Sequence, residues 1–180
     1  MLLKFETDPD EVYLVEATGN MGVALNKWAF LRDHVGKGKF YDKVVFRHVN
    51  FDRGDLMVDN LEKFLSQAIG HKYSLSADKL TRSQTIKVAD MGVDENGDKR
   101  LIAADRTFFC SELVAKAFKI LGIMEDDKTS SAKYFPGNFS TKSAGTLNLT
   151  KGTTIESELM VIVDRDALIN PNEAEILAND

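Results

Sequence analysis

The sequence predicts one α+β domain, in which an antiparallel sheet packs against an amphipathic helix that begins near Cys110. Two strand-like segments joined by a turn open the chain, and a strongly periodic helical pattern covers residues 107–122. With 180 residues and 43% apolar content, the chain is long enough to bury one core. We expect a single domain over residues 1–164, followed by an acidic C-terminal tail over 165–180.

Composition excludes several classes of protein. Lys and Arg total 23 against 28 Asp and Glu, a net charge of −5, and no segment is basic enough to bind nucleic acid. The longest apolar stretches, such as residues 159–163, fall far short of the roughly 20 residues of a membrane span, and no signal peptide is recognisable. The single cysteine, Cys110, excludes an internal disulfide and a multi-cysteine zinc site. We therefore expect a cytoplasmic protein without a cofactor or metal.

The amino-terminal half begins with a predicted hairpin. Residues 1–5 and 11–17 have strand patterns, and Asp8-Pro9-Asp10 turns the chain between them. On the second strand, one face carries Val12, Leu14 and Glu16. We expect a short extended piece at 23–25, a helix that Asn26 caps and that fades at Gly36, and a third strand over 41–49.

The remaining elements follow from helical and turn patterns. A helix is expected from Asp55 to Gly70, and a solvated β-ribbon around Asn96-Gly97. In the helix over 107–122, an apolar stripe is formed by Cys110, Val114, Ala117, Phe118 and Leu121. Residues 126–145 form a loop with enough aromatic residues to pack on the rest of the protein, and residues 159–164 form a last buried strand. This strand and those at 1–5, 11–17 and 41–49 are expected to build one antiparallel sheet on the Cys110 helix.

Cys110 is the first candidate for chemistry. It opens its helix, where free backbone N–H groups and the helix dipole favour an anionic thiolate, as a nucleophile requires. The competing interpretation is structural, because free cysteines are often buried and Cys110 lies on the apolar stripe. Glu112 is about 200° round the helix from the sulfur and is expected to stabilise the first turn instead.

A thiolate nucleophile needs a base and an orienting group. The chain offers His34, His48 and His71, and the sequence favours a helix cap or surface group for each of them over a catalyst. The alternative is that one of them, above all His48 or His71, comes within reach of Cys110 and substitutes as the base. Glu16 is more informative, since it interrupts an apolar strand and a half-buried carboxylate normally has a partner. The alternative is an acid at the strand edge that points into water.

Two motif-like segments do not make sites. Residues 94–105 imitate a calcium loop, but the sixth position is Lys99 instead of glycine and the twelfth is Asp105 instead of glutamate. Gly19 and Gly22 follow a strand without the third glycine and the helix of a dinucleotide site, so we interpret them as turn residues.

As a set, several segments resemble the circularly permuted papain-like cysteine hydrolases, the YiiX/YaeF-type branch of the NlpC superfamily. Residues 108–114, Phe-Phe-Cys-Ser-Glu-Leu-Val, are similar to the family's nucleophile motif. The segment Tyr13-Leu14-Val15-Glu16-Ala17 with Gly22-Val23 resembles its acid-bearing strand, residues 64–73 its helix and Gly-x-x-Tyr turn, and residues 134–140 its Pro-Gly loop. The resemblance covers about residues 11–140 and implies a papain-like sheet packed on the Cys110 helix.

The resemblance also implies roles for individual residues. Cys110 would be the nucleophile, Glu16 the acid that orients the family's histidine, and Tyr73 a substrate or oxyanion contact, although Ser74 stands where the family often has an acid. The family's histidine strand precedes the acid strand, and Met1-Leu2-Leu3-Lys4 would align with its tail, so the general base is missing. His34-Val35-Gly36 matches the residues of the family's histidine motif, but it follows Glu16 and a helix instead of preceding the acid strand, so it is rejected as the family histidine.

Two functions from different classes follow. The first is a hydrolase or acyltransferase that acts on an amide or ester of a peptide or lipid through a thioester on Cys110, nearly inert here because a triad without its base loses most of its activity. The second is a non-catalytic module, or a gene fragment, that binds a peptide or lipid in the degenerate groove.

Overall fold

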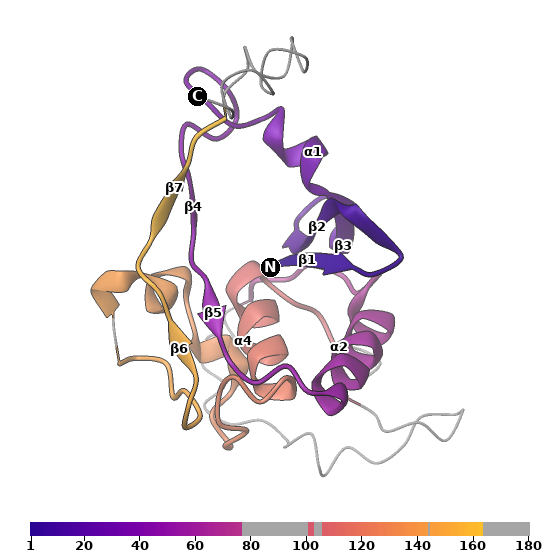
Figure 1. Ribbon diagram of the computed structural model, residues 1–180, viewed down its shortest axis with the longest axis vertical. Coiled ribbons are helices and arrows are strands. Elements are labelled where there is room, and N and C mark those ends of the chain that lie inside the picture. The colour runs from indigo at the N-terminus through magenta and orange to yellow at the C-terminus, as the bar shows by residue number, and fades with distance from the viewer. Residues whose placement is uncertain (77–100, 103–105, 144, 164–180) are drawn as a thin grey trace, which may run out of the picture.

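The computed structural model describes residues 1–76, 101–102, 106–143 and 145–163. The ribbon around Asn96, the calcium-like loop and the acidic tail over 165–180 lie outside these residues. The described part is a mixed α+β structure with small antiparallel sheets, as the sequence predicts (Figure 1).

The largest sheet has three strands in the order β1-β2-β3. Its strands are β1 (Leu2–Phe5), β2 (Asp8–Thr18) and β3 (Gly22–Lys27). The hairpin of β1 and β2 is confirmed, whereas the short extended piece expected at 23–25 is a full sheet strand that pairs with β2 from Thr18↔Gly22 to Tyr13↔Lys27. Asn26 therefore belongs to a strand, and the helix that it was expected to cap is the short α1 (Trp28–Arg32) with Lys27 at its N-cap.

Two further sheets have two strands each. One pairs β4 (Val44–Phe46) with β7 (Leu159–Val161), and the other pairs β5 (Val49–Asn50) with β6 (Thr154–Ile155). The expectation that residues 41–49 and 159–164 join the amino-terminal sheet is wrong, because these strands pair with each other in a separate sheet.

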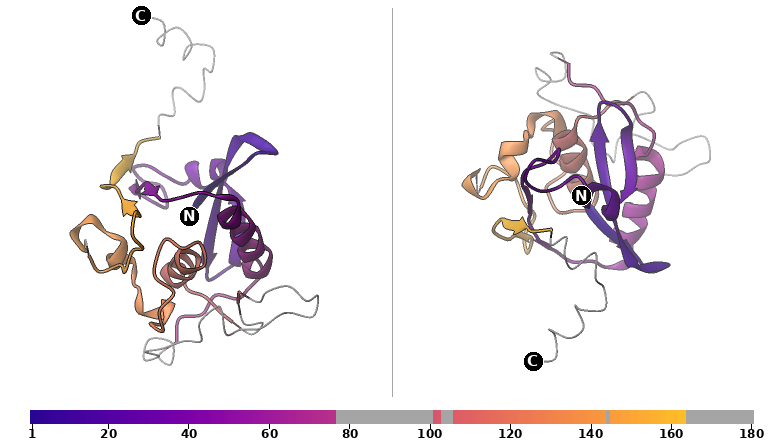
Figure 2. Two further views of the ribbon diagram at one scale, coloured as in Figure 1. Left: turned by 60° about the horizontal axis from the view of Figure 1, so that its bottom comes forward. Right: turned by 90° about the horizontal axis from the view of Figure 1, so that it is seen from above.

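Two long helices support the amino-terminal sheet. Helix α2 (Asp55–Ala68) confirms the predicted periodic segment, and α4 (Cys110–Ile120) confirms the second one, although residues 107–109 remain extended. In the views of Figure 2, α4 lies between α2 and the two small sheets. The aromatic loop after α4 forms the 3-10 turns η2 (Ser131–Lys133), η3 (Pro136–Phe139) and η4 (Thr141–Ser143).

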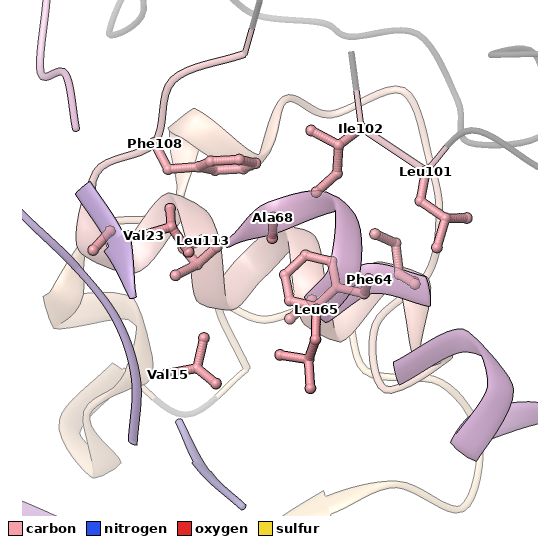
Figure 3. Packing of buried hydrophobic residues seen from close by; sticks show 12 residues of the cluster. Val15, Val23, Phe64, Leu65, Ala68, Leu101, Ile102, Phe108 and Leu113 are labelled. Carbon is pink, nitrogen blue, oxygen red and sulfur yellow. The ribbon is translucent and has the colours of Figure 1, made fainter. Parts of the chain in front are cut away.

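The core has two clusters, one on each side of α4. The first joins the sheet to both helices through residues such as Val15, Val23, Phe64 and Leu113, drawn in Figure 3. The second joins α4 to the loop that follows it, and Tyr134 is buried there with Ala115 and Phe118 among others. The prediction that the aromatic loop packs on the body is thereby confirmed. Because each residue of α4 between Leu113 and Ile120 except Val114 is buried, this helix is the centre of the fold.

Candidate functional site

Cys110 is the first residue of α4, and its side chain is exposed. Of the ten residues that follow it in the helix, nine are buried and Val114 is half-buried. The expectation that Cys110 belongs to the buried apolar stripe is therefore wrong. The helix has only just begun at this position, so the core residues that cover the later turns do not cover its first residue. The thiol is open to a ligand.

A buried ion pair fixes the backbone before Cys110. Arg106 Nη2 donates to Glu112 Oε1 at 2.6 Å, and the side chains are only 8% and 1% exposed. The other carboxylate oxygen of Glu112 accepts from the backbone N–H of Phe109 at 3.3 Å. The prediction that Glu112 stabilises the first turn is confirmed. The sequence does not single out Arg106. Its pairing with Glu112 depends on the change from extended chain to helix after Phe109, and no sequence pattern shows where that change occurs.

Tyr73 lies in a short parallel pairing with the segment that enters α4. Tyr73 bridges to Phe108, Phe108 N–H donates to Lys72 O at 3.0 Å, and Ser74 N–H donates to Phe108 O at 3.0 Å. The pairing brings Tyr73 beside a residue two positions before Cys110, and its ring packs against the first core cluster. The helix-turn-tyrosine segment and the cysteine segment of the sequence are thus neighbours in space.

Glu16 has a different set of neighbours. Its Oε1 accepts from Asn26 Nδ2 at 2.9 Å, across the β2–β3 pair. Val15 and Ala17 are both buried in the first core cluster, under which α2 and α4 pack. Since side chains alternate along a strand, Glu16 lies on the opposite face of β2 from the helices. The expected half-buried carboxylate with a partner is present, but that partner is Asn26.

The α-amino group of Met1 lies next to this carboxylate. It donates to Val15 O at 3.0 Å, and Val15 N–H donates back to Met1 O at 2.8 Å, so the first residue continues the pairing of β1 with β2. Burial lowers the pKa of this amine from 8.0 to about 6, while the negative charge of Glu16 acts in the opposite direction. Glu16 therefore has the Met1 amine and the Asn26 amide near it on this edge of the sheet.

Each of the three histidines has a neighbour of its own. His34 Nδ1 is 2.8 Å from Phe30 O, and the His48 ring is 6.3 Å from that of Phe46. His71 Nδ1 bonds to Arg106 O. Because residues 71–73 run parallel to 106–108, His71 lies four residues before Cys110 along this pairing, about 13 Å at 3.3 Å per residue.

The surface near Cys110 is partly aromatic. The ring of Phe109 stacks on that of Phe135, with centroids 6.5 Å apart, and Phe135 remains 45% exposed. An open pocket of about 520 Å³ lies at the His71 end of the pairing, where Lys72 and Arg106 are among its lining residues. The pocket and the thiol are therefore at different ends of the same two segments.

In residues 1–76, 101–102, 106–143 and 145–163, no three His, Cys, Asp or Glu side chains gather as metal ligands. Across the same ranges, no helix combines the length and the apolar character that crossing a bilayer requires. Comparison of the chain with protein-family models, with curated proteins and with solved structures found no significant match.

Proposed function

We propose that this protein is a cysteine-dependent acyl-transfer domain of the permuted papain-like kind, in which Cys110 attacks an amide or ester of a peptide or lipid. The observation that carries the proposal is the exposure of Cys110 at the first position of an otherwise buried helix. A free cysteine is ordinarily among the most buried residues, so an exposed one at a helix start is placed for reaction rather than for packing.

The chemistry follows from the helix start. The thiolate forms an S–C bond with the substrate carbonyl, and backbone N–H groups at the helix start stabilise the negative oxygen of the tetrahedral intermediate. The C–O or C–N bond then breaks, the leaving group takes up a proton from solvent, and a thioester remains on Cys110. We assign no imidazole to the cleavage of this thioester by water, because the Nδ1 atoms of His34 and His71 bond to backbone carbonyl groups and the His48 ring lies near that of Phe46.

This proposal predicts a burst without turnover. The full chain, mixed with p-nitrophenyl butyrate, is expected to release about one equivalent of p-nitrophenolate and then to slow strongly, because acylation needs only the thiolate while deacylation lacks its base. Intact mass spectrometry is expected to find the butyryl group on Cys110, and Cys110→Ser to abolish the burst.

A matched control separates a poised thiol from any exposed thiol. Glu62 is exposed in the middle of α2, so the double variant Cys110→Ala, Glu62→Cys presents a helical thiol away from either helix end. We expect this control to acylate at least tenfold more slowly than the natural chain, because the dipole acts only within the first turn. Equal rates for the two thiols would overturn the proposal.

A second candidate is a binding module that uses the same surface without catalysis. It is favoured by Glu16, which bonds to Asn26 and faces away from α4 instead of pointing toward the thiol. A chain that only binds will give no burst; if Cys110 is acylated and Glu16 orients no catalytic group, Glu16→Gln will leave the burst rate unchanged. If the Glu16 carboxylate does assist acylation, the burst rate of Glu16→Gln will fall at least tenfold while its fold, measured by circular dichroism, is retained.

A further inference from the structure

Exposed apolar side chains alone do not identify a partner. On the two-stranded ribbon of β4 and β7, Leu159 is 57% and Met160 53% exposed, so the prediction of a buried last strand is wrong. Nothing in the described part of the chain shows what covers these side chains. In the loop between α1 and β4, by contrast, exposed lysines accompany exposed aromatic rings, and the combination of charge and apolar surface indicates the chemistry of a partner.

Backbone hydrogen bonds close this loop into a defined shape. Tyr41 N–H donates to His34 O at 2.9 Å, and Gly36 N–H donates to Tyr41 O at 2.8 Å, so the two ends of the loop lie side by side. Between them, Lys39 N–H donates to Gly36 O at 3.0 Å and forms a tight turn. The loop therefore presents residues 37–40 at its tip.

Aromatic rings are exposed on the loop and on the helix before it. Phe40 is 79% exposed, more than any other aromatic residue in the described part, and its ring contacts that of Tyr41 with centroids 4.7 Å apart. On α1, Phe30 is 61% exposed and its ring lies 5.1 Å from that of His34. Figure 1 shows the segment between α1 and β4 at one end of the molecule, away from α2.

The charge of the loop is opposite to that of the whole chain. Three lysines of the loop are exposed and take part in none of the ion pairs of the described residues: Lys37, Lys39 and Lys43. Asp42 is the one acid among residues 34–43, and Asp33 just before them is paired with Arg32. Residues 34–43 therefore carry +2, which leaves −7 on the rest of a chain whose net charge is −5.

We propose that this loop binds the surface of an anionic phospholipid membrane, with the Phe40 ring at the level of the lipid headgroups and the lysines beside the lipid phosphates. Lasting attachment to a lipid surface needs two signals, and the loop supplies an apolar group together with a basic patch. Aromatic rings are favoured at the membrane–water interface, and each lysine near an anionic leaflet adds electrostatic attraction. This inference does not depend on the function proposed for Cys110.

A membrane fits this loop better than a nucleic acid, although both are anionic. Single-stranded nucleic acids bind along a basic groove that follows the backbone for several nucleotides. Here the lysines are confined to one loop, and an extended polyanion would pass over a body that carries −7. A membrane meets the loop at one end of the molecule, and salt screens charges that lie more than about 8 Å away.

Sedimentation with sucrose-loaded vesicles tests the role of charge. The full chain is expected to bind vesicles of mixed phosphatidylserine and phosphatidylcholine at least tenfold more tightly than vesicles of phosphatidylcholine alone. Lys37→Gln combined with Lys39→Gln should weaken binding to the mixed vesicles at least tenfold. The control Lys63→Gln with Lys151→Gln removes two other exposed lysines, and we expect it to bind like the natural chain. No binding by the natural chain, or an equal loss in both pairs, overturns the proposal.

Substitutions of Phe40 test the apolar contact. Phe40→Ala should weaken binding to the mixed vesicles at least fivefold, whereas Leu56→Ala, which shortens a 74% exposed side chain on α2, should have no effect. Phe40→Trp should keep the binding and shift its fluorescence to the blue on the vesicles, compared with the natural chain and its single Trp28. An unshifted emission from the bound variant, or tighter binding of the natural chain to polyuridylate than to the mixed vesicles, would refute the membrane contact.

Discussion

Arg106 and Glu112 form a nearly buried ion pair that joins the extended residues before α4 to its first turn. Because Glu112 also accepts from Phe109 N–H, a single carboxylate sets both the end of the extended segment and the start of the helix. The position of Cys110 on the surface depends on this arrangement, since Cys110 lies between Phe109 and Glu112 in the chain.

Removing the carboxylate is expected to be costly. Glu112→Ala leaves the Arg106 guanidinium buried without its counter-ion, and such changes destabilise proteins by about 3–5 kcal/mol. Glu112→Gln keeps a side-chain acceptor for Phe109 N–H and is expected to lose less. Urea unfolding measures both variants. A loss below about 1 kcal/mol for Glu112→Ala would show that the pair does not hold the helix start.

Gly22 and Gly19 offer a matched pair in one turn. Gly22 has a φ of +71°, and a Cβ there would lie 2.3 Å from His71 O, which also accepts from Val23 N–H at 2.8 Å. We expect Gly22→Ala to destabilise the fold by about 2–4 kcal/mol, because it combines a left-handed backbone with a backbone clash. Gly19 has open space around it, so Gly19→Ala should change stability by less than about 0.5 kcal/mol in the same melt.

The α-amino group of Met1 predicts a dependence of stability on pH. Its pKa is lowered to about 6 in the fold and is about 8 when unfolded, so the unfolded chain binds more protons between these values. Stability is therefore expected to rise from pH 6 to pH 8, by about 2 kcal/mol from this group. Because Glu16 attracts the ammonium, Glu16→Gln should lower the pKa of the amine further, as measured by NMR of the isotopically methylated amine. An amine that titrates near 8 would contradict the burial of Met1.

Two buried lysines on α4 are expected to respond in opposite ways. Lys119 Nζ donates to Asp127 Oδ1 at 2.6 Å and to Thr129 O at 2.8 Å, so Lys119→Met should destabilise the fold by about 2–4 kcal/mol. For Lys116, burial and then the charge of Arg106 lower the pKa to about 8. Lys116→Met removes this penalty and should stabilise the fold by about 2 kcal/mol at pH 7.

The pH dependence checks the sign for Lys116. The unfolded lysine titrates near 10.5, so stability of the natural chain should rise between pH 8 and 10.5, and the advantage of Lys116→Met should shrink over the same range. Parallel urea titrations at pH 7 and pH 10 measure this difference. An advantage that stays constant with pH would mean that packing, rather than charge, explains the effect of the substitution.

Periodic helices were the most predictable part of this fold. Residues 55–68 and 110–120 are helical as expected, because their apolar spacing repeats over three or more turns and no competing strand pattern exists there. Short segments were less predictable. Residues 22–27 were expected to be extended only briefly, and their strand becomes evident only from pairing with β2, which the turn at Gly22 imposes.

The sequence names candidate residues for a site but does not give their geometry. The sequence identifies Cys110, Glu16 and Tyr73 as unusual residues, and the structure brings Tyr73 beside Phe108, two residues before the thiol. The sequence cannot reveal that Asn26 bonds to Glu16, because an asparagine before a helix is also a normal N-cap residue. The exposure of Cys110 could not be predicted from the sequence either. Helical periodicity places Cys110 on the apolar stripe whether or not the core extends to the first turn of the helix.

The pairing of Val44 with Val161 spans most of the polypeptide. During synthesis, residues 44–46 therefore leave the ribosome long before their hydrogen-bonding partner has been translated, while β1, β2 and β3 can assemble at once as neighbours. The ribbon is consequently the last part of the protein to assemble, and a nascent chain stalled before residue 159 presents an unpaired valine-rich segment to chaperones and proteases.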